Sequence, residues 1–329
     1  KMISVIVPTF NGEETVAECL DSLLTQSYKG EYEVIVVDDG STDRTSDIVK
    51  KYPVKLLIQG HKGPAAARNI GARNASGDIL LFTDDDCIAE KNWIEEMVQP
   101  FDNPEIAGVQ GRYKTEQRRL IARFAQYEIE ERYERMQKHK YIDFIGSYSA
   151  AYRRNVFLKE GGFDESFPIA SGEDPDLSFR LAAKGHKMVF ALNAIVYHRH
   201  PDTLAKYLRQ KFYRAYWRVV LYRKNPKKMV RDSYTPQTVK IHLGFFYLFV
   251  LSLIYAIAVG YWGIIIAAFF LFFLPSLPLS LAIIKKDKAV GIVAPFIIML
   301  RSATLSVGMV FGMLRSIRFE RNIYSRSSS

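Results

Sequence analysis

The stretch Leu80-Leu81-Phe82-Thr83-Asp84-Asp85-Asp86-Cys87 joins an apolar run to three adjacent carboxylates. A run of this length, bounded by polar residues, is typical of a buried parallel strand that ends at the edge of a sheet. Three neighbouring acids repel one another unless a cation neutralises them or water solvates them. Mg²⁺ or Mn²⁺, held by carboxylates and by substrate phosphates, would supply that cation. The ordinary alternative is a solvated acidic turn that precedes a helix.

Strand-like and helical segments alternate along the first part of the chain. We expect strands over 3–7, 32–37, 54–58 and 79–82, and helices over 15–26, 46–51 and 64–74. This alternation predicts an α/β fold with a doubly wound, mostly parallel sheet. Ligands of such sheets bind beyond the carboxyl ends of the strands. Polar clusters at 8–11, 38–43 and 84–86 all follow predicted strands, which favours a binding site over a solvated turn.

The last part of the chain contains a long apolar block. No Asp, Glu, Lys or Arg occurs from Ile241 to Ile284, and this length suits two membrane spans, at about 241–259 and about 264–284. Gly260-Tyr261-Trp262-Gly263 is expected to form the turn between them, with its aromatic residues at the membrane interface. Pro275 and Pro278 are expected to kink the second span.

A third apolar stretch, 289–314, contains Arg301. A charge at that depth is costly unless it faces water, protein or a phosphate. One interpretation is a re-entrant pair of segments broken near Arg301. We favour a third span, because Gly308 and Gly312 indicate close helix packing.

The charge of the chain also points to a membrane. The 329 residues carry a net charge of +10. Basic residues crowd beside the apolar block, at Arg223, Lys224, Lys227, Lys228, Arg231, Lys240, Lys285, Lys286 and Lys288. This placement favours anionic headgroups over nucleic acid, and it predicts an integral membrane protein with its catalytic domain on the cytoplasmic face. The two cysteines, Cys19 and Cys87, give no disulfide framework and suit a reducing compartment.

Two further segments have helical patterns. Residues 204–222 are amphipathic, basic and aromatic, which is typical of a helix that lies at the membrane interface. Residues 112–140 are rich in charge, and we expect a mostly solvated helix there, with no chemistry assigned to it.

Several motifs occur in the order found in a known family. They are Val7-Pro8-Thr9-Phe10-Asn11, Val36-Val37-Asp38-Asp39-Gly40-Ser41-Thr42-Asp43, Ala67-Arg68-Asn69-Ile70-Gly71, Asp84-Asp85-Asp86, Gly146-Ser147-Tyr148-Ser149-Ala150-Ala151-Tyr152-Arg153-Arg154, Gly161-Gly162-Phe163-Asp164 and Gly172-Glu173-Asp174. Over roughly residues 2–200 the chain resembles the family 2 inverting glycosyltransferases, which have the GT-A fold. With its membrane tail it looks like a minimal cellulose-synthase-like enzyme or a polyprenyl-linked mannosyl- or glucosyltransferase.

This resemblance implies roles for single residues. Pro8, Thr9 and Asp39 would contact the nucleotide base, and Arg68 would help hold the base or a phosphate. Asp84 would meet the ribose or the metal, and Asp86 would bind the metal. Asn11, Asp85 and Glu173 are grouped with the same nucleotide-sugar site. In the amphipathic helix, Gln210, Arg214 and Trp217 loosely resemble the Gln-x-x-Arg-Trp motif of cellulose-synthase-like enzymes, which suggests acceptor contacts, although the spacing departs from that motif.

Sugar transfer also needs a base that takes the proton of the acceptor hydroxyl. Asp174 is the candidate, because small residues and Pro175 frame a helix start around it. The ordinary alternative is that Asp174 is the N-cap of that helix, although Glu173 or Asp176 could hold the cap instead. His198 ends a strand-like run and could complete the metal shell, as a downstream histidine does in some members of the family. His200 is the weaker candidate, and either histidine could simply bond a loop.

The sequence therefore predicts a membrane-bound, metal-dependent, inverting hexosyltransferase. It would move a hexose from a nucleotide diphosphate sugar to a polyprenyl-phosphate-linked or glycolipid acceptor, as in the assembly of N-glycans or other glycans. Mannose from GDP-mannose is the first expectation, and glucose or N-acetylglucosamine from a UDP-sugar is the second. The alternatives are a processive polysaccharide synthase, which would need more spans, and a non-catalytic membrane scaffold, against which the acids at 84, 86 and 174 argue.

The predicted domains follow from these segments. Residues 1–202 form the catalytic domain, and residues 203–240 form the interface helix with a basic linker. Residues 241–317 form a transmembrane domain of two to three spans, and residues 318–329 form a basic tail.

Overall fold

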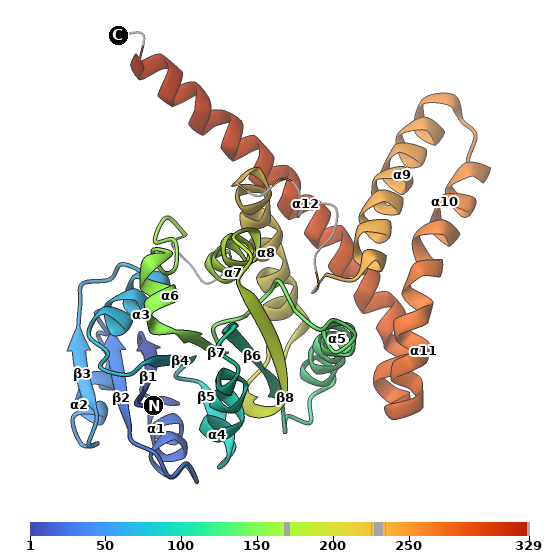
Figure 1. Cartoon of the computed structure of the whole chain (residues 1–329). Coiled ribbons are helices and arrows are strands. Elements are labelled where there is room, and N and C mark those ends of the chain that lie inside the picture. The colour runs from blue at the N-terminus through green and yellow to red at the C-terminus, as the bar shows by residue number, and fades with distance from the viewer. Residues whose placement is uncertain (168–171, 225, 227–232, 234, 328–329) are drawn as a thin grey trace. The chain divides into compact units, whose positions relative to one another are not determined.

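The computed structural model describes residues 1–167, 172–224, 226, 233 and 235–327 (Figure 1). The chain divides into two compact units. Residues 1–116 and 133–199 make up most of the first unit, and residues 117–132, 200–224 and 235–327 make up most of the second. The sheet lies in the first unit, and the described part of the second is built of helices.

One mixed sheet of eight strands forms the centre of the first unit. In spatial order the strands are β3 (Lys55–Ile58), β2 (Tyr32–Asp38), β1 (Ile3–Thr9), β4 (Ile79–Thr83), β7 (Ser149–Arg153), β6 (Ile106–Lys114), β8 (Lys187–His198) and β5 (Cys87–Ala89). The first four are parallel to one another, β7 is antiparallel to β4 and β6, β6 and β8 are parallel, and β5 is antiparallel to β8. The predicted α/β sheet is confirmed.

The apolar runs explain the centre of this sheet. Every residue of β1 and β4 is buried, as expected for strands that helices cover on both faces. The helices of the first unit are α1 (Val16–Leu24), α2 (Thr45–Val49), α3 (Pro64–Arg73), α4 (Trp93–Val98), α6 (Arg154–Lys159) and α7 (Glu173–Ala183). Of these, α3 packs on β1 and β2, and α4 packs on β4, β6, β7 and β8. A Cβ on Gly71 would lie 2.4 Å from Ile6 Cγ2, so glycine allows α3 to approach β1 closely.

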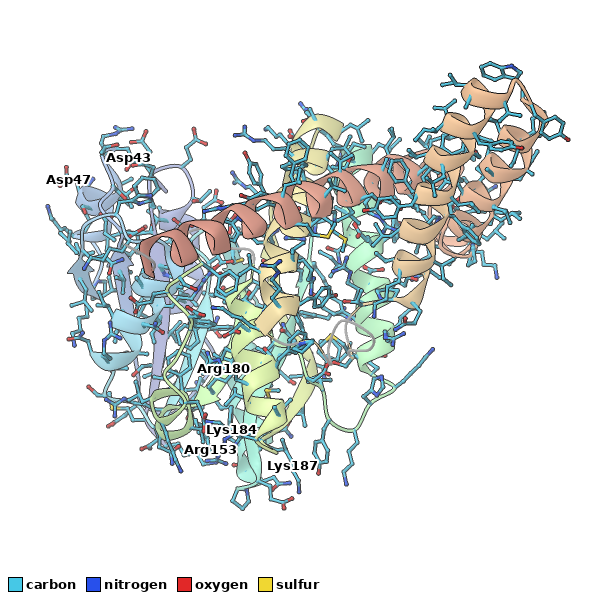
Figure 2. All side chains as sticks on the ribbon, turned by 90° about the horizontal axis from the view of Figure 1, so that it is seen from above. Asp43, Asp47, Arg153, Arg180, Lys184 and Lys187 are labelled. Carbon is cyan, nitrogen blue, oxygen red and sulfur yellow. The ribbon has the colours of Figure 1, made fainter. Side chains whose placement is uncertain are left out.

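The helix α7 is fixed to the turn that precedes it. Arg180, labelled in Figure 2, donates hydrogen bonds to the carbonyl oxygens of Glu160 and Gly162, each at 2.6 Å. Its Nε also donates to Asp176 Oδ2 at 2.9 Å. This anchoring holds the start of α7, where Glu173 and Asp174 lie, against the sheet unit.

The second unit consists of longer helices. They are α5 (Leu120–Met136, of which residues to Arg132 belong here), α8 (Leu204–Lys224), α9 (Gln237–Val259), α10 (Gly263–Phe273), α11 (Leu277–Lys286) and α12 (Lys288–Ser327). Three helical segments are long and apolar enough to cross a membrane: Gln237–Val259, Gly263–Lys286 and Lys288–Arg315. Gly260 ends α9 with a φ of 78°, and a 3-10 turn over Leu274–Ser276 separates α10 from α11 at the predicted proline.

The third apolar segment is one unbroken helix through Arg301, so the re-entrant alternative is wrong for these residues. The predicted close packing at its glycines is confirmed, and the partner is α8, which runs beside α12 in Figure 1. A Cβ on Gly308 would lie 2.5 Å from the carbonyl oxygen of Phe212, and one on Gly312 would lie 2.5 Å from that of Tyr216. Two backbones meet here because neither glycine carries a side chain.

The expectation of a solvated helix over 112–140 is wrong in two respects. Arg112 to Lys114 belong to β6, and the helix α5 spans only Leu120–Met136. Most of α5 is buried or half-buried, because its apolar side packs into a cluster with Tyr207, Ile283, Ile297 and others. Its charged residues are accommodated by pairing within the protein.

Candidate functional site

The candidate site lies at the carboxyl ends of β1, β2 and β4. The strand order changes direction between β1 and β4, because the chain moves outward from β1 to β3 and then returns to the other side of β1. Ligands of open α/β sheets bind at such a switch point. Pro8 and Thr9 end β1, Asp38 ends β2 opposite Thr9, and Asp84 to Asp86 follow β4. Topology therefore gathers the three predicted polar clusters at one edge.

The middle acid of the triplet faces inward. Asp85 Oδ2 accepts a hydrogen bond from Thr9 Oγ1 at 2.5 Å. A Cβ on Gly12 would lie 2.2 Å from the same oxygen, so the loop after β1 passes directly over it. Burial, together with the charges of Asp86 and Asp84, raises the pKa of Asp85 to about 7, although the hydrogen bond from Thr9 acts in the opposite direction. Asp85 therefore connects the loop after β1 with the loop after β4, and its contact with the nucleotide sugar stays a prediction.

Arg68 connects the first acid of the triplet with α7. Its side chain is 3% exposed; Nη2 lies 2.7 Å from Asp84 Oδ1, and Nη1 lies 3.2 Å from Glu173 Oε1. Glu173 is itself buried, and its other oxygen accepts the backbone N–H of Gly172. A single guanidinium thus holds two carboxylates that are far apart in sequence.

Asp86 and His198 lie side by side. Asp86 immediately precedes β5, which pairs with β8 so that Cys87 lies opposite His198, and His198 Nε2 is 3.3 Å from Asp86 Oδ2. The His198 ring also stacks on Tyr113 at a centroid distance of 4.4 Å. His200, by contrast, is buried in the second unit, where its Nε2 lies 2.8 Å from Gln126 Oε1.

The acids at this edge fit a hard divalent cation. Ligand atoms of Asp84, Asp86 and Cys87 all lie within 4.8 Å of one another. Burial and the charge of Asp86 raise the pKa of the Cys87 thiol, so it stays protonated and is a poor ligand. The two carboxylates remain, and carboxylate oxygens are the donors that Mg²⁺ and Mn²⁺ prefer. His198 is placed where its ring could join them.

Asp174 is half-buried, and its two oxygens differ. Oδ2 accepts hydrogen bonds from the backbone N–H and the hydroxyl of Ser147, at 3.0 and 3.2 Å, whereas Oδ1 has no hydrogen-bond partner among the described residues. Burial and the charge of Glu173 raise the pKa of Asp174 to about 7, although Arg68 acts in the opposite direction. The N-cap of α7 is Gly172, so the capping alternative is wrong for Asp174, and Glu173 and Asp176 do not occupy that position either.

Two of the predicted nucleotide-binding residues are engaged within the loops. The Asp39 carboxylate is buried and accepts hydrogen bonds from Gln59 Nε2 and from the backbone N–H groups of Lys62 and Gly63. Asn11, with a φ of 53°, accepts the backbone N–H of Thr42 at 2.8 Å. Both side chains hold the loops at the rim of the site, and their contacts with the nucleotide stay a prediction.

Sequence reasoning missed two features of the site. Phe10 is exposed, and its ring packs against that of His61 with the centroids 4.2 Å apart and the planes tilted by 31°, which provides an aromatic surface at the rim. Ser147 orients Asp174, and the motif around Gly146 was the signal that could have pointed to it. Phe10 lies within the motif Val7 to Asn11, but its partner His61 is distant in sequence and belongs to none of the motifs.

The loosely matched acceptor residues lie in the second unit, on α8. Arg214 lines a cavity there together with Lys211 and Arg218. The guanidinium of Arg315 lies over the indole ring of Trp217, with Arg315 Cζ 4.9 Å from the ring centroid. Gln210 lies half-buried on the same helix. The three residues therefore have different surroundings, and of the three Arg214 lines the cavity.

Comparison with known proteins agrees with this geometry. The sequence pattern of the family described as "Glycosyl transferase family 2" matches residues 4–161. The chain is 30% identical over 208 residues to glycosyltransferase AglE of Haloferax volcanii, covering 60% of this chain and 66% of that one. It is also 30% identical over 229 residues to an N-acetylglucosaminyltransferase of Azorhizobium caulinodans, covering 64% and 57%. The chain thus spans somewhat less than two thirds of the length of these curated relatives.

Solved structures are similar in fold. The mannosyltransferase PcManGT from Pyrobaculum calidifontis, in complex with GDP-Man and Mn²⁺, has a TM-score of 0.60 and 21% identity, covering 94% of this chain and 87% of that one. TarS of S. aureus has a TM-score of 0.50 and 24% identity, covering 66% and 39%. Both structures are similar to this chain in the arrangement of their helices and strands.

Proposed function

Because residues 4–161 form a domain of glycosyl transferase family 2, we propose that this protein is a membrane-bound, inverting hexosyltransferase that acts on a lipid-linked acceptor. One observation carries the proposal. A strand-end acid cluster suited to a divalent cation lies in the same unit as a half-buried carboxylate, Asp174, whose shielded Oδ1 has no hydrogen-bond partner among the described residues. A guanidinium, Arg68, links the two through Asp84 and Glu173.

The donor would be a nucleotide diphosphate sugar. Asp84 and Asp86, with His198, would hold Mg²⁺ or Mn²⁺, which when bound neutralises charge on the diphosphate leaving group. Phe10 and His61 offer a stacking surface to the base, and Arg68 sets the orientation of Asp84. GDP-mannose is the first donor we propose, as in the complex of the solved neighbour, and a UDP-hexose is the second, in keeping with the N-acetylglucosaminyl relative.

Asp174 would act as the general base. The acceptor hydroxyl oxygen attacks the anomeric carbon as the bond to the diphosphate breaks, and the hydroxyl proton passes to Asp174 Oδ1. A pKa raised to about 7 suits this task, since a base is most effective when its pKa lies near the working pH. Ser147 holds Oδ2, so Oδ1 stays directed to one position.

The acceptor would be a glycan or hydroxyl carried on a polyprenyl phosphate. Three segments long and apolar enough to cross a membrane support this choice, because a freely soluble acceptor would gain nothing from them. The basic flanks of these segments support a catalytic unit on the cytoplasmic face.

Two measurements test this function. A screen of nucleotide-sugar hydrolysis by the whole chain in detergent, with and without Mn²⁺, should reveal one preferred donor that is cleaved only with the cation. Acceptors with the same head group, one on a long isoprenoid chain and one water-soluble, should then differ, with the lipid preferred. Cleavage of no donor would overturn the enzymatic proposal, and a preference for the soluble acceptor would overturn the lipid assignment.

A further inference from the structure

A cavity of about 240 Å³ lies within the second unit, among α5, α8, α9 and α12. This volume is below the roughly 300–1,000 Å³ of pockets for drug-sized ligands, so it suits a head group and not a whole lipid. Its described lining residues are Glu128, Arg132, Lys211, Arg214, Ala215, Arg218, Tyr222, Thr235, Val239, Lys240, Leu243, Arg301, Leu305 and Met309. Six of them are basic and one is acidic, so the described lining carries a large excess of positive charge.

The single acid is already saturated with cations. Glu128 Oε2 lies 2.8 Å from Lys211 Nζ, and Glu128 Oε1 lies 2.9 Å from Arg132 Nη2 and 3.2 Å from Arg301 Nη1. Tyr207 also donates its hydroxyl to Oε2 at 2.7 Å. Glu128 and Arg301 are each 3% exposed, and Lys211 is 6% exposed. One carboxylate thus faces three basic side chains that are largely shielded from solvent.

Buried charges are costly unless they are neutralised. Burial lowers the pKa of Lys211 to about 7, and Arg214 and Arg132 act in the same direction, although Glu128 opposes them. Arg301 Nε is buried and has no hydrogen-bond partner among the described residues. Among the described residues the lining therefore carries more positive than negative charge, and Arg301 Nε lacks a hydrogen-bond acceptor. An anion in the cavity would add negative charge and acceptor oxygens.

The rest of the lining defines the kind of anion. Val239 and Leu243 come from α9, and Leu305 and Met309 come from α12, so one wall belongs to segments long and apolar enough to cross a membrane. A ligand with a phosphate at one end and a hydrocarbon chain at the other matches this division. A phosphate also provides several strong acceptor oxygens for guanidinium groups.

We propose that this cavity binds the phosphate of an isoprenoid lipid, with Arg214, Arg218 and Arg301 as its principal contacts. The inference rests on the proposed function, since that lipid is the proposed acceptor. Glu128 then has a positioning role, because it orders Arg301, Arg132 and Lys211 around the cavity before the lipid enters.

The test measures binding and needs no turnover. The whole chain in detergent is titrated with a polyprenyl phosphate, with the same polyprenol lacking phosphate, and with inorganic phosphate, and the increase in thermal unfolding temperature reports affinity. The double variant Arg214→Gln/Arg218→Gln should bind the polyprenyl phosphate roughly 10-fold or more weakly than the unaltered chain, as expected for lost charge-assisted hydrogen bonds. These two side chains are half-buried and neither is paired with Glu128 in the ion pairs above, so the fold should survive.

Arg209→Gln is the matched control, because Arg209 is exposed on the same helix. It should leave affinity unchanged. Equal binding by the double variant and the control, or equal binding of the neutral polyprenol, would overturn the proposal. Inorganic phosphate that binds as tightly as the lipid would show a free-phosphate site and overturn the lipid assignment. If the unaltered chain binds the lipid phosphate but cleaves no nucleotide sugar, the proposed function fails and the cavity assignment stands.

Discussion

Arg68 Nη2 lies 2.7 Å from Asp84 Oδ1, so the partly exposed first acid of the strand-end triplet is paired with a buried guanidinium. The same guanidinium reaches Glu173 on α7. The orientation of the acid cluster and the position of the proposed base therefore depend on one side chain.

Arg68→Gln should both destabilise the protein and weaken donor binding. The substitution leaves Glu173, which is 1% exposed, without its charge partner, and removing one member of a buried pair costs about 3 kcal/mol. Urea unfolding of the chain in detergent measures this cost. Arg73→Gln is the control, because Arg73 lies on the same helix, is 55% exposed and approaches Glu165 only to 3.8 Å. Equal stability of the two variants would contradict the bridging role.

Asp86→Ala should abolish the Mn²⁺ dependence of donor binding while the fold persists. Calorimetric titration of the nucleotide with and without Mn²⁺ measures this dependence. Asp47→Ala removes an exposed acid on α2 and should leave the Mn²⁺ dependence of donor binding unchanged.

His198→Ala should weaken Mn²⁺ affinity by roughly 10- to 100-fold, the range for residues that bind a metal ion or orient its ligands. His200→Ala should weaken it less, because His200 pairs with Gln126; the opposite order would move the ligand to His200.

Asp174→Asn should slow transfer by roughly 10²- to 10⁴-fold and leave donor affinity intact, because it keeps the shape of the side chain and removes its basicity. Single-turnover transfer and donor titration separate the two effects. Asp176→Asn is the comparison on the same helix, since it breaks the pair with Arg180 and should lower stability more than the transfer rate. Near-normal transfer by the Asp174 variant would exclude it as the base.

The transfer rate should depend on pH through Asp174. The base acts when deprotonated, and its pKa is raised to about 7. The rate constant should therefore be constant above about pH 7 and fall about tenfold for each pH unit below it. The residual activity of Asp174→Asn should lack this fall. A fall that persists in the variant would assign the titration to another group.

Gly308→Leu should destabilise the helical unit, because a Cβ there already lies 2.5 Å from the backbone of α8. Thermal unfolding in detergent should show a loss of about 1–3 kcal/mol, typical of overpacking. Gly244→Ala in α9 is the opposite case, since a Cβ there meets nothing within 4 Å, and it should be neutral or stabilising by up to about 1 kcal/mol. Similar effects from both variants would argue against close contact of α8 and α12.

The parallel half of the sheet could be predicted because its strands are continuous apolar runs that turn residues interrupt. The strand-like run that ends at His198 is also present, as β8, but some other strands could not be predicted. The strand β5 has three residues, and β6 contains Gly108, Gln110 and Gly111, with register irregularities on either side of Gln110 where it pairs with β8. Their strand character comes from pairing with segments distant in sequence, and local composition does not record it.

The candidate site could also be predicted only in part. Acids at strand ends are visible in the sequence, but the partners that decide what each acid does are not. Asp85 faces Thr9 and Asp174 faces Ser147, although both pairs are widely separated along the chain. Glu128 is the clearest case, because it precedes Arg132 by one helical turn and resembles an ordinary exposed pair, whereas Lys211 and Arg301 reach it only in the folded chain.

The separation of Glu128 from Arg301 also matters for biosynthesis. The two residues lie 173 positions apart, and ribosomes add roughly 5–20 residues per second, so Arg301 is made roughly 10–35 seconds after Glu128. During that interval α5 carries a carboxylate whose final partner does not yet exist. The ion pair between Glu128 and Arg301 can therefore form only after the part of α12 that contains Arg301 has been translated.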